Sequence, residues 1–204
     1  MLSAVVLAAG MSARMGKNKL LLEFRTKPLI AHAVDTLLAS EVDEVVVVLG
    51  HEAEKIRDKL QRKRVRLVQN PHYREGLSTS VRAGVRAVSP QAEAIMIYLA
   101  DQPLLESADV NFIVRAFTYA KTINKRIVVP FFNGQRGNPV ILDSSYKEAI
   151  LGLIGDVGCR GVIKRYPDEV FLVEMENDHV VRDVDNADDF QQVLLSAQPK
   201  SNKN

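Results

Sequence analysis

Residues 3–19 read SAVVLAAGMSARMGKNK, and this stretch indicates both the class of fold and the place of a site. Its first part, Ser3–Ala9, is a short apolar run of the length and composition typical of a buried parallel strand. A loop with two glycines and the cations Arg14 and Lys19 follows. Ligands of open α/β sheets bind beyond the carboxyl ends of the strands, and glycine turns let backbone N–H groups face phosphate oxygens. We therefore expect this loop to hold a nucleoside triphosphate.

Spacing separates this loop from two familiar phosphate-binding motifs. A Walker loop has four residues between its Gly and its Gly-Lys, followed by Ser or Thr, whereas five residues separate Gly10 from Gly16 here and Asn18 follows Lys17. The Gly-x-Gly-x-x-Gly pattern of dinucleotide-binding folds is absent from the loop as well. An ordinary strand-to-helix connection with two solvated cations is the alternative that spacing alone leaves open.

Size and composition predict one enzyme-sized domain. The chain has 204 residues, 47% of them hydrophobic and 25% charged, which suits a single sizeable α/β core. We expect a domain over residues 1–195 and a frayed polar tail over 196–204. A net charge of +2 does not indicate nucleic-acid binding. Basic residues do concentrate in one run, but their helical spacing favours a solvated helix face: Lys55, Arg57, Lys59, Arg62, Lys63, Arg64 and Arg66.

The remaining compositional signals exclude several classes. The single cysteine, Cys159, has no partner for an internal disulfide, and the four histidines lack zinc-ligand spacing. Neither a signal peptide nor an apolar stretch of membrane-spanning length stands out. These features predict a cytoplasmic protein with no membrane association.

Strand-like and amphipathic segments alternate along most of the chain, which predicts repeated β-α units. We expect a single-domain α/β fold with a mainly parallel, doubly wound sheet in three Rossmann-like layers. Helices are expected from residue 28, from residue 77, and over 107–121 and 187–197. Strands are expected over 3–9, 45–49, 65–68, 94–99, 126–130, 140–142, 169–174 and 180–184.

Carboxylates follow two of these expected strands. Asp101 comes just after strand 94–99, so parallel strands would place it at the same sheet edge as the first loop. This is a natural position for Mg²⁺, which binds through one or two carboxylates plus phosphate oxygens, although an Asp before Pro103 also suits a turn. Asp183 and Asp185 would share one face of a strand, while Asp185 or Asn186 could instead cap the last helix.

Residues 75–80 read EGLSTS and combine a glycine with hydroxyls at a predicted helix start. Backbone N–H groups are unpaired there, so the segment could bind an anion or a polar ligand. Capping alone would explain Ser78.

Several segments of the chain resemble one enzyme family, and four of them belong to its donor side. LAAG-x-S-x-R-M-G-x-x-K (residues 7–19) is similar to the signature of nucleotidyltransferases such as the molybdenum cofactor guanylyl- and cytidylyltransferases, and more distantly of sugar-phosphate nucleotidyltransferases. Asp-Gln-Pro at 101–103 resembles the family's metal-binding segment. Residues 76–80 resemble its loop for the base and ribose, and Asp183–Asn186 resembles the D-x-D or N-x-N segment before its last helix.

The resemblance implies roles for the donor side. Arg14 would hold the triphosphate, Lys19 would neutralise the α-phosphate, and Mg²⁺ would lie at Asp101 and Asp185. Ala9 stands where guanylyl-transferring relatives tend to have Gly, which favours CTP as the donor. The residues implied to bind nucleotide are Leu7, Ala8, Ala9, Gly10, Gly76 and Ser80.

The acceptor side of the resemblance is less regular. Arg136-Gly137-Asn138-Pro139 is similar to a segment that usually reads R-G-H-P in the cytidylyl-transferring group, with Asn138 in place of His. Asn cannot titrate near neutral pH, so we expect no proton transfer from this position. Residues 155–160 resemble the family's G-D-x-G-x-R loop, so Asp156 joins Arg136 and Asn138 as acceptor candidates; Asp156 could equally cap the short helix that follows.

Taken together, the resemblance implies transfer of CMP from CTP to the terminal phosphate of molybdopterin, with release of pyrophosphate and no protein nucleophile. Two alternatives remain open at this level. One is transfer to another phosphorylated acceptor, such as a sugar phosphate or methylerythritol phosphate. The other is a maturation partner that binds the cofactor and hands it to a molybdoenzyme without transfer.

Overall fold

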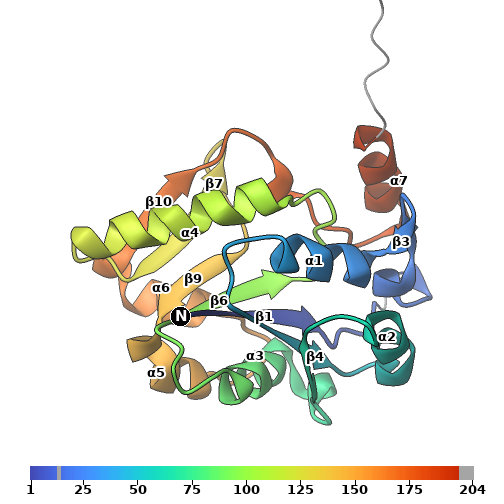
Figure 1. The fold of residues 1–204 in the computed structure, drawn as a ribbon, viewed down its shortest axis with the longest axis horizontal. Helices are drawn as coiled ribbons and strands as arrows, with labels where there is room; N and C mark the ends of the chain where they lie inside the picture. Colours follow the sequence, from blue (N-terminus) through green and yellow to red (C-terminus); the bar gives the residue numbers. More distant parts are fainter. Residues whose placement is uncertain (13–14, 198–204) are drawn as a thin grey trace, which may run out of the picture.

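The computed structural model describes residues 1–12 and 15–197 as one α/β domain built on a twisted sheet (Figure 1). Its strands run in the order β10-β7-β9-β6-β1-β4-β5, with β8 paired to β7. The strands are β1 Leu2–Ala8, β4 Glu44–Leu49, β5 Arg66–Gln69, β6 Ala94–Leu99, β7 Ile127–Phe132, β8 Gln135–Arg136, β9 Val140–Asp143 and β10 Val170–Glu174. A small hairpin joins β2 (Glu23–Phe24) to β3 (Lys27–Pro28).

The sheet is mainly parallel, as predicted. β1 pairs in parallel with β4 and β6, β4 with β5, and β10 with β7. β9 is antiparallel to both of its neighbours, β6 and β7. The carboxyl ends of β1, β4, β5 and β6 therefore meet at one edge of the sheet.

Helices cover both faces and make the three expected layers (Figure 1). α1 (Leu29–Leu38), α2 (Ala53–Leu60) and α4 (Ser107–Thr122) pack on one face. α3 (Leu77–Ala87), α5 (Lys147–Leu151) and α6 (Arg160–Arg165) pack on the other. α7 (Ala187–Ser196) closes the described chain, and short 3₁₀ turns lie at Lys19–Leu21, Tyr73–Glu75, Ser144–Tyr146, Pro167–Glu169 and His179–Val181.

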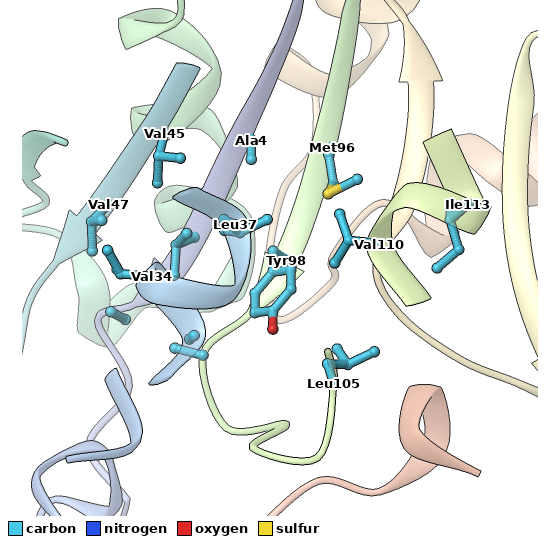
Figure 2. Packing of buried hydrophobic residues seen from close by; sticks show 14 of the residues in the cluster. Ala4, Val34, Leu37, Val45, Val47, Met96, Tyr98, Leu105, Val110 and Ile113 are labelled. Carbon is cyan, nitrogen blue, oxygen red and sulfur yellow. The ribbon is translucent and has the colours of Figure 1, made fainter. Parts of the chain in front are cut away.

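Helices cover both faces of β1, which explains why every residue of the strand but Ser3 is apolar. All seven residues of β1 are buried. Ala4 and Val6 pack toward α1 and α4, whereas Val5 and Leu7 pack toward α3. Figure 2 shows the first of these layers, with Tyr98 between the side chains of α1 and α4.

The expected strand over 180–184 is wrong. His179–Val181 forms a 3₁₀ turn, here called the 179–181 turn, and residues 182–186 are irregular. Val180 is fully buried, and its carbonyl oxygen accepts bonds from Gln102 Nε2 and from the Asn138 N–H, both at 2.9 Å. A β-carbon at Gly137 would lie 2.4 Å from that oxygen, so only glycine allows this close approach. Hydrogen bonds to Gln102 and Asn138 thus take the place of the β-sheet hydrogen bonds that a strand over 180–184 would have made.

Two boundary predictions concern the ends of the chain. The predicted last helix, 187–197, agrees closely with α7. The predicted tail over 196–204 falls mostly on residues 198–204, which lie outside the described residues. No helix within the described part of the chain has the length and apolar character needed to cross a bilayer.

Candidate active site

A cavity of about 670 Å³ opens at the carboxyl edge of the parallel strands. Residues following β1 and β6 form part of its lining, and the turn before α3 forms another part. The lining consists of Leu7, Ala9, Gly10, Met11, Ser12, Lys19, Leu20, Tyr73, Arg74, Glu75, Gly76, Leu77, Ser80, Leu99, Asp101, Asp156 and Asp185. Most of the residues expected from the sequence to bind nucleotide or metal thus meet in one hollow.

The loop after β1 is folded back so that Lys19 faces this hollow. Asn18 is buried, and its side chain accepts a bond from the Leu20 N–H at 3.1 Å, which caps the 3₁₀ turn starting at Lys19. The Lys19 N–H donates to Ser12 Oγ at 3.1 Å. These bonds fix the backbone at Lys19, whose side chain lines the cavity. Arg14, the other cation expected in this loop, lies outside the described residues.

Lys19 joins two carboxylates that are distant in sequence. Its Nζ lies 2.6 Å from Asp101 Oδ2 and 3.0 Å from Asp185 Oδ1. Burial alone would lower the pKa of Lys19, but the charges and hydrogen bonds of Asp101 and then Asp185 outweigh it, so the pKa is raised. The Lys19 side chain is therefore an ammonium ion at neutral pH.

The backbone explains how Asp185 reaches Asp101. The Val184 N–H donates to the Asp101 carbonyl at 2.9 Å, which ties the segment before α7 to the end of β6. The Asn186 side chain caps α7 by accepting the Asp189 N–H at 3.0 Å. Asp185 and Asn186 were the two candidates for this cap. Asn186 is the residue that caps α7, and the Asp185 side chain lines the cavity.

The donor set fits a hard divalent cation. Asp101 Oδ1 is buried and has no hydrogen-bond partner among the described residues, so it has free acceptor capacity beside Asp185. No group of three His, Cys, Asp or Glu side chains suited to a metal occurs within residues 1–12 and 15–197. Mg²⁺ commonly uses one or two carboxylates and takes its other ligands from water and substrate phosphates. Asp101 and Asp185 match that pattern.

The start of α3 lines another part of the cavity. Gly76 has φ +112°, and a β-carbon there would lie 2.6 Å from the Gly155 carbonyl oxygen. That carbonyl accepts the Ser78 N–H at 3.2 Å, and Asp156 Oδ1 accepts the Leu77 N–H at 3.1 Å. The alternative in which Asp156 caps the helix after it does not hold, because α6 has no side-chain cap and Asp156 pairs with the first N–H of α3 instead. Ser78 is not that cap either, since its buried Oγ has no partner among the described residues.

Asn70 is a site residue that sequence reasoning missed. It is buried at the end of β5, and its Nδ2 donates to Ser80 Oγ at 3.0 Å and to Thr79 Oγ1 at 2.9 Å. Ser80 lines the cavity and can still donate its own hydroxyl proton. In the sequence, Asn70 and Pro71 directly follow an apolar run. That pattern predicts a loop and does not indicate that Asn70 belongs to the site.

A second missed residue is Arg74. It lines the cavity, with its guanidinium carbon 5.3 Å from the centroid of the Tyr73 ring. This stacking holds the cation at the rim of the hollow. Among the described lining residues, Lys19 and Arg74 are the two cations.

Three expected site residues do not join the others. Within the described chain, the cavity lining does not include Ala8, Arg136 or Asn138. Ala8 is fully buried in β1, and Arg136 is exposed in β8. Asn138 is half-buried, with its backbone bonded to the 179–181 turn. Asp156 is the acceptor candidate that does line the cavity.

Comparison with known families decides the class of this site. The model of the MobA-like NTP transferase domain matches residues 4–170, which include most of β1, the loop after it, the start of α3 and Asp101, but not Asp185. The chain belongs to the MobA-like NTP transferase family. It is therefore a nucleotidyltransferase by family and by fold, and the resemblance seen in the sequence is confirmed.

Curated relatives of this family member carry several functional names. It is 27% identical to nicotine blue oxidoreductase of Paenarthrobacter nicotinovorans, covering 94% of this chain and 96% of the relative. It is 24% identical to the molybdenum cofactor cytidylyltransferase of Escherichia coli, covering 93% of each. It is 33% identical to the purine catabolism protein PucB of Bacillus subtilis, covering 80% of each.

Solved structures share the fold. The Rv0371c protein of Mycobacterium tuberculosis superposes with a TM-score of 0.84 at 24% identity, over 95% of this chain and 97% of that one. A nucleotidyl transferase from Methanothermobacter gives 0.81 at 25% identity, over 97% and 99%. Rv0371c has also been solved in complex with manganese, with a TM-score of 0.76 over 96% of this chain and 98% of that one.

Proposed function

We propose that this nucleotidyltransferase transfers CMP from CTP to the terminal phosphate of molybdopterin and releases pyrophosphate, with Mg²⁺ as its metal. The observation that carries the proposal is the junction of Lys19, Asp101 and Asp185 at the cavity. An ammonium and two carboxylates at one point are what a metal-assisted attack between two phosphates requires. The cytidylyltransferase of E. coli supports the finer assignment, as does Ala9 in the first loop.

The donor nucleotide would lie along the loop after β1. Backbone N–H groups around Gly10 would face the triphosphate, and Lys19 would neutralise negative charge at the α-phosphate. Arg14 would steady the departing pyrophosphate. Gly76 and Ser80 would contact the base and ribose, with Ser80 oriented by Asn70.

Asp101 and Asp185 would hold Mg²⁺, which supplies charge neutralisation between donor and acceptor phosphates when it is bound. Asp101 Oδ1 has no partner in the described chain, so this carboxylate keeps acceptor capacity for a metal. Asp156, which also lines the cavity, would meet the acceptor.

No side chain needs to form a covalent intermediate. Cys159 is buried, and burial raises the pKa of its thiol to about 12, so it is not a thiolate at neutral pH. The acceptor phosphate would attack the α-phosphorus in line, while the protein positions both partners and stabilises the charge.

Pyrophosphate release measured with each of the four nucleoside triphosphates tests the proposal. The acceptors are molybdopterin, a sugar 1-phosphate, methylerythritol phosphate, and none. The expected result is release with CTP and molybdopterin together. Release with a different acceptor would reassign the substrate. Capture of a molybdoenzyme by a preparation without any turnover would favour a maturation partner.

A further inference from the structure

We propose that the Lys19 ammonium occupies the cation position between Asp101 and Asp185, and that a divalent metal must displace it to bind. This inference rests on the proposed function, in which the two carboxylates hold the metal. It adds that one of the protein's own charges competes with the metal for this position.

The geometry of the three groups carries the proposal. Lys19 Nζ lies within hydrogen-bond distance of one oxygen from each carboxylate, 2.6 Å from Asp101 Oδ2 and 3.0 Å from Asp185 Oδ1. The Lys19 side chain is 14% exposed and that of Asp101 is 18% exposed, so water screens their interaction poorly. A metal that bridged the same two carboxylates would stand close to the ammonium and be repelled by it.

The site also has room for the Lys19 ammonium to move away when a metal takes its place. Asp101 Oδ1 is buried without a partner in the described chain, so the carboxylate keeps one acceptor oxygen that the Lys19 contact does not use. The long aliphatic stem of Lys19 can swing while the backbone stays fixed by Asn18 and Ser12. The open cavity beside it is about 670 Å³, which leaves room for the displaced ammonium.

This exchange predicts how metal binding depends on the nucleotide. Without nucleotide, the metal competes with a resident cation and binds weakly. A triphosphate brings oxygens that receive both the metal and the freed ammonium, so metal and nucleotide bind together. The same lysine thus weakens metal binding in the empty site and assists the phosphates in the filled one.

Mn²⁺ binding to the nucleotide-free protein, measured by calorimetry or electron paramagnetic resonance, tests this exchange. Lys19→Met keeps the stem and removes the charge, so Mn²⁺ should bind at least about tenfold more tightly than to the wild type. Lys17→Met is the matched control, because Lys17 is an exposed lysine two residues away, and it should leave the affinity unchanged. Adding Asp101→Asn to Lys19→Met should abolish the gain.

Equal or weaker Mn²⁺ binding by Lys19→Met would overturn the proposal, and so would a gain that survives Asp101→Asn. Amine acetylation followed by mass spectrometry provides a second readout in the wild-type protein, which needs no folded variant. Saturating Mn²⁺ should raise the labelling of Lys19 several-fold, and no increase would contradict displacement. Both measurements omit substrate, so a failure of the proposed transfer reaction would be seen separately as absent pyrophosphate release.

Discussion

His179 Nδ1 lies 2.9 Å from Asp109 Oδ2, and this contact joins the 179–181 turn to the first turn of α4. Asp109 also accepts bonds from the Asn177 amide at 3.0 Å and from the Glu106 N–H at 2.9 Å. The turn that it anchors carries Val180, whose carbonyl binds Gln102 and Asn138. The His179–Asp109 contact therefore braces the segment that leads to Asp185.

This contact should make stability depend on pH. The hydrogen bond to Asp109 raises the pKa of His179, with the negative charges of Asp109, Glu106 and Asp178 adding to it. Burial opposes ionisation of Asp109, but the bonds from His179 and Asn177 lower its pKa overall. The stabilisation is complete below the ordinary His value of about 6.5 and above the ordinary Asp value of about 3.9. It is lost as the pH rises through the raised pKa of His179, or falls through the lowered pKa of Asp109.

His179→Gln should reveal that window in the free energy of unfolding. Near pH 5.5, the variant should be less stable than the wild type by about 1–2 kcal/mol, because a charged hydrogen bond is replaced by a neutral one. Toward pH 9, as His179 loses its proton, the difference should shrink. Denaturant titrations at the two pH values measure it, and a difference independent of pH would show that the ion pair adds nothing.

Gly76→Ala should damage both the fold and the cavity. The φ of +112° disfavours a side chain, and the new methyl group would meet backbone atoms of Gly155 and Asp156 that cannot swing away. We expect a loss of about 1–3 kcal/mol in stability and weaker nucleotide binding. Gly134→Ala provides the control, because it also has positive φ but meets no atom within 4 Å. Equal effects of both changes on nucleotide binding would contradict the assigned role of the Gly76 turn.

Asn70→Ala tests the orientation of Ser80. The change removes a donor to two hydroxyls, Thr79 Oγ1 and Ser80 Oγ, in a buried place. Stability should fall by about 1–3 kcal/mol, and the KM for the donor nucleotide should rise more than kcat falls. Steady-state kinetics on the folded variant separate the two effects. An unchanged KM would mean that Ser80 does not depend on Asn70.

Tyr98→Phe should be neutral or stabilising, unlike most changes in the core. Its hydroxyl is buried and has no partner among the described residues, and burial raises its pKa so that it stays protonated. Removing an unpaired polar group keeps the packing seen in Figure 2 and removes a desolvation cost of about 1 kcal/mol. Thermal unfolding measures the change. A clear loss of stability would show that the hydroxyl has a partner, such as a buried water.

Much of the fold could be predicted because its signals are local. The apolar run at Ser3–Ala9 and the spacing of later strands follow from burial and the β-α rhythm, and the parallel sheet then brings Gly10, Lys19 and Asp101 to one edge. The prediction that Asp101 lies at the same edge as the first loop needed only that strands 3–9 and 94–99 be parallel, and β1 and β6 do pair in parallel.

The rest depended on tertiary contacts that leave no local pattern. The 179–181 turn reads as part of a strand because Val180, Val181 and Val184 lie close together in the sequence. In the structure, the Val180 carbonyl instead accepts bonds from Gln102 and Asn138 and holds the turn. Asp156 reaches a helix 79 positions away in the chain, and its sequence neighbours suggested a nearer one. Asn70 acts through Ser80, which no spacing rule connects to it.

Pyrophosphate release by the wild type, Lys19→Ala and Asp101→Ala, with and without a chelator, is the most direct test of the central claim that these two residues serve a metal-assisted nucleotidyl transfer. The account predicts cooperative folding for all three proteins and a fall in turnover of about a hundredfold or more in either variant, since each loses charge stabilisation at the reacting phosphates. Chelation should abolish release by the wild type. Near-normal release by both folded variants would contradict the account.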